Sequence, residues 1–168
     1  MSSLKMVPIK EPEHIAELAN LAETIWREYF PSMLTPDKLD HLLKHMLSIE
    51  VLTREIADEG YEFYFAQADG ENIGFVGIVQ QDDALFLSKL YLLKEARGKG
   101  YGRQEFNFVL QRAKELGHKK ITLTCDRNNK ASWQRYEHMG FVRTGEVNTD
   151  VGGGYQMNDY TMEYIIKD

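Results

Sequence analysis

Residues 97–102 read Arg97-Gly98-Lys99-Gly100-Tyr101-Gly102, and they join an apolar run, Leu85 to Leu93, to a helical pattern. In that pattern apolar residues recur at the spacing of one helix face, at Phe106, Val109, Leu110, Ala113 and Leu116. Glycines permit positive φ and leave space above the backbone, so several N–H groups can converge on one anion. The helix start adds unpaired donors, and Arg97, Lys99 and Arg103 add positive charge. The sequence therefore predicts a phosphate-binding turn between a strand and a helix.

Two common phosphate-binding motifs do not fit this turn. The P-loop needs glycine followed by Lys-Ser or Lys-Thr, which the turn lacks. The dinucleotide fingerprint needs a third glycine, but Arg103 stands at that position after Gly98 and Gly100. The pattern that remains is [RQ]-x-x-G-x-[GA], and a Rossmann-type nucleotide site is disfavoured.

A second motif follows about thirty residues later, Asn129-Lys-Ala-Ser132-Trp-Gln-Arg-Tyr136-Glu-His-Met-Gly140-Phe141. Asn129, Ser132 and Tyr136 fall on one face of a helix, because they stand at i, i+3 and i+7. Gly140 ends this helix, and Phe141 begins the next strand. The two motifs, in this order, resemble those of the GNAT acyltransferase superfamily over about Leu90 to Phe141.

The order of elements along the whole chain agrees with this resemblance. Periodicity and turn residues predict β-α-α-β-β-β-α-β-α-β-β, with a helix from Pro12 to about Phe30 and a second helix from Thr35 into the fifties. Strand, helix and strand around the glycine turn form a right-handed βαβ unit. The resemblance implies an α/β (α+β) fold, with a mixed, mostly antiparallel sheet of about seven strands, four helices, and an opening in the sheet beside the glycine turn.

The resemblance also implies a cofactor, acetyl-CoA, and the residues that hold it. The turn would bind the pyrophosphate of coenzyme A through its backbone amides, Leu90 to Leu92 would bond the pantetheine arm, and the N–H of Leu92 would face the oxyanion. Asn129 would contact the pantetheine or the departing thiol. The residues expected to bind the cofactor are Leu90, Tyr91, Leu92, Arg97, Gly98, Lys99, Gly100, Tyr101, Gly102, Arg103, Asn129, Ser132 and Tyr136.

Tyr136 and the backbone of Leu92 are the candidate catalytic groups. A phenol titrates near pH ~10, so Tyr136 is protonated at neutral pH and can give a proton to a departing thiolate. The alternative is a tyrosine that only packs beside the cofactor. The base that deprotonates an acceptor amine cannot be chosen from the sequence, where Asp82, Asp83, Glu28 and Glu95 are candidates by location alone.

Several other residues can be interpreted either as structural or as functional. Trp26 and Tyr29, in the first helix, are either acceptor-pocket residues or ordinary core aromatics. His41 and His45 have a metal-binding spacing, but without a third ligand they are better explained as surface histidines, and no metal site is predicted. Cys125 is interpreted as a small buried side chain. The glycines at 152–154 form a hairpin loop or a mobile flap over the acceptor site.

Composition bounds the class of protein. The 168 residues suit a single domain spanning 1–168, with 43% hydrophobic and 27% charged residues. The net charge of −6 argues against a nucleic-acid surface. The sequence has no apolar run of about 18 residues and no signal-peptide core, so no membrane partner and a cytoplasmic location are expected. A homodimer is left undecided.

The sequence therefore favours an N-acetyltransferase that moves the acetyl group from acetyl-CoA to a primary amine, by direct attack through a tetrahedral intermediate. A small-molecule amine is the preferred acceptor, with a protein N-terminus or a lysine side chain as the second choice. A non-catalytic acyl-CoA-binding module is the alternative from a different class.

Overall fold

The computed structural model describes residues 3–167, which form one seven-stranded sheet with helices on both faces. The strands are β1 (Lys5–Pro8), β2 (Glu62–Ala68), β3 (Glu71–Gln80), β4 (Leu85–Leu92), β5 (Lys120–Asp126), β6 (Val142–Asp150) and β7 (Gln156–Ile165). The helices are α1 (Pro12–Tyr29), α2 (Pro36–Met46), α3 (Ile49–Asp58), the 3₁₀ turn η1 (Lys94–Ala96), α4 (Tyr101–Glu115) and α5 (Lys130–Met139). The predicted fold class and order of elements are confirmed.

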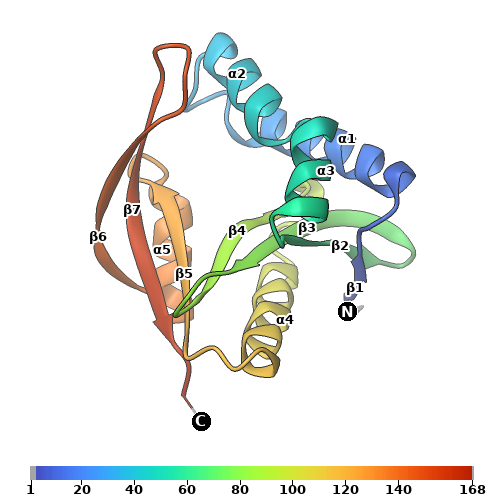
Figure 1. Cartoon of the computed structure of the whole chain (residues 1–168), viewed down its shortest axis with the longest axis vertical. Coiled ribbons are helices and arrows are strands. Elements are labelled where there is room, and N and C mark those ends of the chain that lie inside the picture. Colours follow the sequence, from blue (N-terminus) through green and yellow to red (C-terminus); the bar gives the residue numbers. More distant parts are fainter. Residues whose placement is uncertain (1–2, 168) are drawn as a thin grey trace.

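The sheet opens between its two halves. Its order is β1-β2-β3-β4-β5-β7-β6, and every pair of neighbours is antiparallel except β4 and β5. In the described chain the parallel β4–β5 pairing is confined to Leu85 with Ile121 and Phe86 with Thr122. Beyond Phe86 the two strands diverge, and Figure 1 shows β1 to β4 turning away from β5, β7 and β6. The expected opening beside the glycine turn is therefore present.

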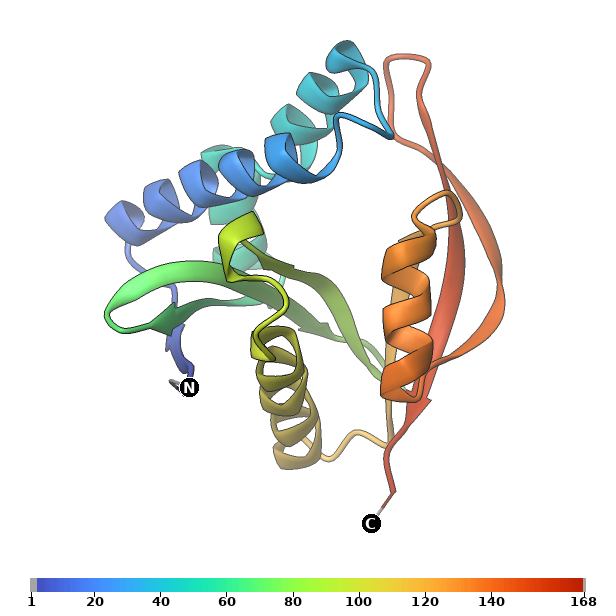
Figure 2. The ribbon, with the colours of Figure 1, turned by 180° about the vertical axis from the view of Figure 1, so that it is seen from behind.

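The helices cover the two faces of the sheet unequally. One buried cluster joins α1, α2 and α3 to the side chains of Phe63, Phe65 and Phe75 on β2 and β3. A second cluster joins α4 to β3, β4 and β5 through Phe106, Val109 and their neighbours. Figure 2 shows α4 and α5 on the same side of the sheet, flanking the opening, while α1 crosses above it. None of the described helices is long and apolar enough to span a bilayer.

The second predicted helix is two helices. The chain leaves α2 at Leu47, and Ser48 starts α3 by accepting a hydrogen bond from the amide of Val51 at 3.3 Å. A serine hydroxyl that satisfies an amide of the first turn is a preferred helix cap, so the sequence begins a new helix there. Thr35 caps α2 in the same way, with the amide of Lys38 at 3.2 Å.

The last hairpin is longer than predicted. The sequence predicts a connection over residues 148–154, but Asn148, Thr149 and Asp150 continue β6 and pair with Asn158, Met157 and Gln156 of β7. Polar residues are tolerated there because β6 is an edge strand whose side chains are largely exposed. The connection is thereby reduced to residues 151–155, in which Gly152, Gly153 and Gly154 all have positive φ.

Candidate active site

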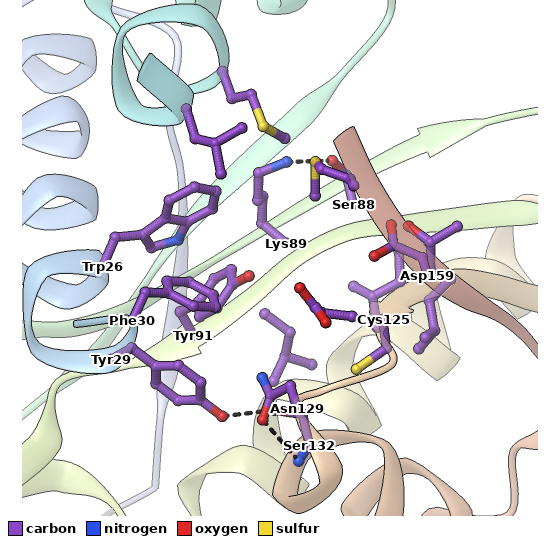
Figure 3. A pocket seen from close by; sticks show the side chains of 18 of the residues that line it. Trp26, Tyr29, Phe30, Ser88, Lys89, Tyr91, Cys125, Asn129, Ser132 and Asp159 are labelled. Carbon is purple, nitrogen blue, oxygen red and sulfur yellow. Dashed lines mark hydrogen bonds between the residues drawn. The ribbon is translucent and has the colours of Figure 1, made fainter. Parts of the chain in front are cut away.

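A cavity of about 590 Å³ fills the opening between β4 and β5. Its lining comes from both halves of the sheet, from α1, α2 and α3, from the glycine turn, and from α5. Figure 3 shows aromatic side chains of α1 and β4 on one side of this cavity, and Cys125 and Asp159 on the other. Asn129 and Ser132, from the second motif, lie at the lower part of the cavity in this view, where Ser132 meets Tyr29.

The glycine turn has the conformation that its sequence predicts. Gly98 and Gly100 have φ of 76° and 87°, in the left-handed region that favours glycine. Gly100 is the N-cap of α4, without a side-chain cap. Among the described residues, the backbone amides of residues 98–103 donate no backbone hydrogen bond, and the first amide to do so is that of Gln104, to Gly100 O at 3.3 Å. These free donors and the positive end of the helix dipole suit an anion.

The predicted phosphate-binding residues divide into two groups. Arg97, Gly98, Gly102 and Arg103 line the cavity. Lys99 and Gly100 are exposed and outside this lining, and the side chain of Tyr101 is buried in a separate cluster with Ala68 and Ala96. Tyr101 can therefore meet a ligand of this turn through its backbone, and its ring has a packing role.

The side chain of Arg97 folds back onto the end of β4. Its Nε and Nη2 donate to the carbonyl oxygen of Leu92 at 3.3 and 3.1 Å. Its guanidinium carbon lies 4.6 Å from the centre of the Tyr29 ring, at cation–π distance. A cation is thus held at the boundary between the glycine turn and the aromatic part of the cavity.

A bulge in β4 decides which groups face the opening. Gly77 pairs with Lys89 and Ile78 pairs with Leu87, so Ser88 is the extra residue. After the bulge, the hydrogen bond from Leu93 N to Ile73 O at 2.8 Å fixes the alternation of the ladder. Leu90 and Leu92 are then at non-hydrogen-bonded positions with respect to β3. Their N–H groups point towards β5, which has already diverged, and so face the cavity.

The second motif forms one wall of the cavity from a single face of α5, as its spacing predicts. Asn129 caps this helix by accepting from the amide of Ser132 at 3.3 Å, and Asn129, Ser132 and Tyr136 all line the cavity. The Tyr136 ring packs 5.5 Å from that of Phe141. Burial first, and then the nearby Cys125, raises the pKa of the Tyr136 hydroxyl, which is therefore protonated at neutral pH.

Tyr29 and Trp26 reach the cavity from α1, so the structure brings both predicted acceptor residues to it. The Tyr29 hydroxyl lies 2.6 Å from Ser132 Oγ and accepts from Arg135 Nη2 at 2.7 Å, which links α1 to α5. Trp26 lines the cavity but is 3% exposed and packs on Phe30 and Tyr91. Its indole Nε1 is buried without a partner in the described chain. Trp26 is thus a core aromatic and a cavity residue at once.

Two charged groups that line the cavity, Lys89 and Glu55, were not predicted from the sequence. Lys89 is 8% exposed, and its Nζ donates to Ser88 Oγ at 2.9 Å. Burial lowers the pKa of Lys89, and the half-buried Glu55 of α3 opposes this shift. Burial likewise raises the pKa of Glu55, which also lines the cavity. The bulge places Ser88 and Lys89 on the same face, which strict alternation along the strand could not have shown.

Asp159 is the third missed residue. This β7 residue is 5% exposed, lines the cavity, and its Oδ1 has no hydrogen-bond partner among the described residues. Burial, followed by the charge of Asp126 on β5, raises the pKa of Asp159 to about 6. The two-residue period of a strand was a usable indication, since it places residue 159 on the same face as Met157, which also lines the cavity.

The four base candidates named from the sequence do not line the cavity. Asp82 and Asp83 stand before β4, at the closed end of the sheet, and Asp83 lies 3.5 Å from Lys120 with 79% of its side chain exposed. Glu28 accepts from the amide of Lys94 at 3.1 Å, outside the cavity, and Glu95 is exposed. Nearness along the sequence to β4 or α1 does not decide which face a side chain takes, so location alone did not bring these candidates to the cavity.

The contacts of His41, His45 and Cys125 indicate structural roles for these side chains. His41 Nε2 lies 2.6 Å from the Val151 carbonyl oxygen, and its ring packs 4.3 Å from that of His45. The described residues contain no group of three or more His, Cys, Asp or Glu side chains suited to a metal. Cys125 is buried on β5, where burial and two nearby carboxylates raise the pKa of its thiol to about 12. A thiol so protonated is a poor nucleophile, which agrees with a packing role.

The sequence and the fold were compared with those of known proteins, and the comparison identifies a family. The model of the acetyltransferase (GNAT) family matches residues 18–141. An uncharacterised N-acetyltransferase from the pepI 3′ region of Lactobacillus delbrueckii subsp. lactis is 24% identical over 87% of this chain and 88% of its own length.

Two solved structures have the same fold. The PaiA N-acetyltransferase of Thermoplasma acidophilum, in complex with coenzyme A, has a TM-score of 0.79 and 22% identity over 96% of this chain and 99% of its own. A mutant of the spermidine N-acetyltransferase SpeG of Vibrio cholerae has a TM-score of 0.69 and 19% identity over 97% and 94%. The family model spans well over half of the sequence, and its motifs converge on one cavity. This chain therefore belongs to the acetyltransferase (GNAT) family.

Proposed function

We propose that this protein is an N-acetyltransferase that transfers the acetyl group of acetyl-CoA to a primary amine of a small molecule. The observation that carries the proposal is the opening between β4 and β5, which has a phosphate-binding turn beside it and one face of α5 along it. The coenzyme A complex of the PaiA relative supports the choice of cofactor. The part of the cavity lined by α1, α2, α3 and the β6–β7 hairpin, where we expect the acceptor, favours a small molecule over a folded protein because it is recessed between these elements.

The free amides of the turn fit a diphosphate. The unpartnered N–H groups of residues 98–103 and the guanidinium of Arg103 would hold it at the start of α4. The amide of Leu90, which faces the opening, would bond the pantetheine arm that follows. The thioester would then lie between the end of β4 and α5, where Asn129 and Ser132 complete the wall.

The chemistry needs a donor for the developing oxyanion and a proton for the departing sulfur. We assign the first role to the N–H of Leu92, because it faces the opening. A preorganised donor of this kind contributes about 3 to 4 kcal/mol. We assign the second role to Tyr136, whose hydroxyl is protonated at neutral pH and lines the cavity on the same side as Asn129. The acetyl group is supplied by the thioester, which is activated towards amines.

The test is a thiol-release screen with acetyl-CoA against polyamines, aminoglycosides, amino acids and peptides, alongside calorimetry with coenzyme A. The proposal expects micromolar to millimolar cofactor binding and release of thiol with at least one amine. Cofactor binding without thiol release for any amine would instead identify a non-catalytic acyl-CoA-binding module. Preference for peptides over small amines would move the acceptor to a protein N-terminus or lysine.

Tyr136→Phe tests the acid role. Loss of the hydroxyl should lower kcat on the order of 100-fold, because general acid catalysis contributes at least that much, while coenzyme A affinity stays close to wild type. The ring itself remains to pack on Phe141. Unchanged turnover in the variant would contradict the assignment.

A further inference from the structure

Two carboxylates stand opposite one another on the cavity wall formed by β5 and β7. Asp126 and Asp159 are direct partners in the antiparallel ladder, and both line the cavity. Asp159 is 5% exposed, and its Oδ1 has no hydrogen-bond partner among the described residues. In Figure 3 Asp159 lies beside Cys125, across the cavity from Trp26, Phe30 and Tyr91. A carboxyl group that lines a cavity and has a buried oxygen without a partner in the described chain is the condition expected of a group whose partner is a ligand.

The protein's own cations near Asp159 are engaged elsewhere. Arg127, which follows β5, binds Glu146 and donates to Asn148 Oδ1 at 3.0 Å. Lys38 of α2 donates to the carbonyl oxygen of Gln156 at 2.8 Å. The residue opposite Asp159 on β6 is Val147, which is apolar. Like charges directly opposite each other in a sheet are unfavourable. A bound cation would therefore stabilise the pair of Asp126 and Asp159.

A third cation, Lys89, lies on another wall of the cavity. Its Nζ is bound to Ser88 Oγ at 2.9 Å on β4, and the carboxylate that affects its titration is Glu55 of α3. The acceptor side is therefore divided, with a cation on β4 and a pair of carboxylates on β5 and β7. An amine that enters this space is directed by charge towards the carboxylates.

We propose that Asp159, with Asp126 beside it, binds the ammonium group of the acceptor and takes one proton from it, so that the neutral amine can attack the thioester. This inference rests on the proposed function. The proton passes from the ammonium nitrogen to a carboxylate oxygen of Asp159, and the nitrogen lone pair forms the C–N bond while the carbonyl π electrons move onto oxygen. Collapse of this tetrahedral oxyanion breaks the C–S bond, and Tyr136 gives its proton to the departing thiolate. A second proton from nitrogen restores the Tyr136 hydroxyl, and Asp159 later returns its proton to solvent.

The pH dependence follows from the groups around Asp159. Burial and the charge of Asp126 raise its pKa to about 6, while Thr124, Arg127 and Lys38 oppose the rise. Asp159 must be ionised to bind an ammonium group, so kcat/KM should increase as the pH rises through about 6. Removal of the Asp126 charge lowers the pKa of Asp159, and the midpoint of this rise should then move to lower pH.

The experiment compares a charged and an uncharged nucleophile. Thiol release from acetyl-CoA is measured with n-butylamine, which is an ammonium ion at neutral pH, and with hydroxylamine, which is neutral there. Asp159→Asn should lower kcat/KM for n-butylamine on the order of 100-fold and leave that for hydroxylamine within about threefold. Asp126→Asn should shift the pH midpoint downward. The matched control is Glu163→Gln, a carboxylate of the same strand that is outside the cavity lining and 3.5 Å from Lys120.

Each outcome separates this inference from the proposed function. If the wild type binds coenzyme A but releases thiol with neither nucleophile and with no amine of the screen, the function itself is overturned. If the wild type acetylates n-butylamine and Asp159→Asn does so equally well, the role of Asp159 alone is overturned. An equal loss towards both nucleophiles would show that the carboxylate only maintains the shape of the cavity, which also overturns the inference.

Discussion

At the scale of single residues, the site is built from groups left without partners. The amides of residues 98–103, the indole Nε1 of Trp26 and Oδ1 of Asp159 lack hydrogen-bond partners among the described residues. An unmade hydrogen bond on a buried group costs about 1 to 3 kcal/mol. The fold therefore carries this cost at the buried atoms of Trp26 and Asp159, which ligands that complete the bonds would offset. The turn amides belong mostly to exposed residues, so there an anion would replace water.

Gly102 allows a functional glycine to be distinguished from a structural one. Its φ is outside the left-handed region, and a Cβ built there would meet one atom, Leu92 Cδ1, at 3.9 Å. Gly102→Ala should therefore fold normally and be stabilised by up to about 1 kcal/mol, since alanine is favoured over glycine in a helix. Because Gly102 lines the cavity, the added methyl group should keep a diphosphate away from the amides and weaken coenzyme A binding at least about tenfold.

Calorimetry with coenzyme A and urea unfolding together check this prediction. Asn107→Ala is the matched control, because it places an alanine on an exposed position of the same helix, outside the cavity lining. Normal affinity in Gly102→Ala would mean that phosphates do not approach the start of α4.

At the scale of elements, the close packing of β3 against β4 holds the amides of Leu90 and Leu92 in place. A Cβ at Gly74 would lie 2.3 Å from the Tyr91 carbonyl oxygen and 3.2 Å from Oε2 of the buried Glu105. The first contact is with backbone, so β4 itself would have to move. This glycine thus sets the distance between the strands at the open end of the sheet.

Gly74→Ala should lower the free energy of unfolding by about 1 to 3 kcal/mol, the usual cost of overpacking. Urea denaturation measures this value. Gly145→Ala on the edge strand β6 is the control, because its Cβ would meet Thr161 Oγ1 at 3.4 Å and its φ is not positive. If the two variants were equally stable, the contact with the Tyr91 carbonyl would not constrain β4.

Local rules explain what the sequence predicted and where prediction stopped. The glycine turn and the face of α5 follow from spacing within a few residues, so Gly98, Gly100 and Tyr136 could be placed in advance. The position of Asp159 in the site depends on the pairing of β5 with β7, which joins residues distant in sequence. The position of Lys89 depends on the bulge at Ser88, which shifts the register of β4 by one residue. The end of α2 was missed because the cap at Ser48 follows an apolar pattern that continues without interruption.

At the scale of the molecule, the two halves of the sheet are joined at both ends of the opening. At the closed end, β4 and β5 pair through Leu85 and Phe86. At the other end, the tip of the β6–β7 hairpin meets α2, as Figure 1 shows, where His41 Nε2 lies 2.6 Å from Val151 O. Val151 and Met157 of this hairpin also line the cavity. The glycine-rich tip is therefore a hairpin loop docked on a helix, at the acceptor side.

His41→Ala should release the hairpin tip and leave the glycine turn untouched. Because the tip closes the acceptor side, KM for the amine should rise about three- to tenfold, equivalent to the loss of a hydrogen bond worth about 1 kcal/mol, while coenzyme A affinity changes less than twofold. Steady-state kinetics and calorimetry measure the two quantities separately. His14→Ala, on α1 and outside the cavity lining, is the control. A contact that acts only where the amine binds should leave coenzyme A affinity unchanged. An equal loss of amine and cofactor binding would therefore mean that the hairpin supports the whole opening.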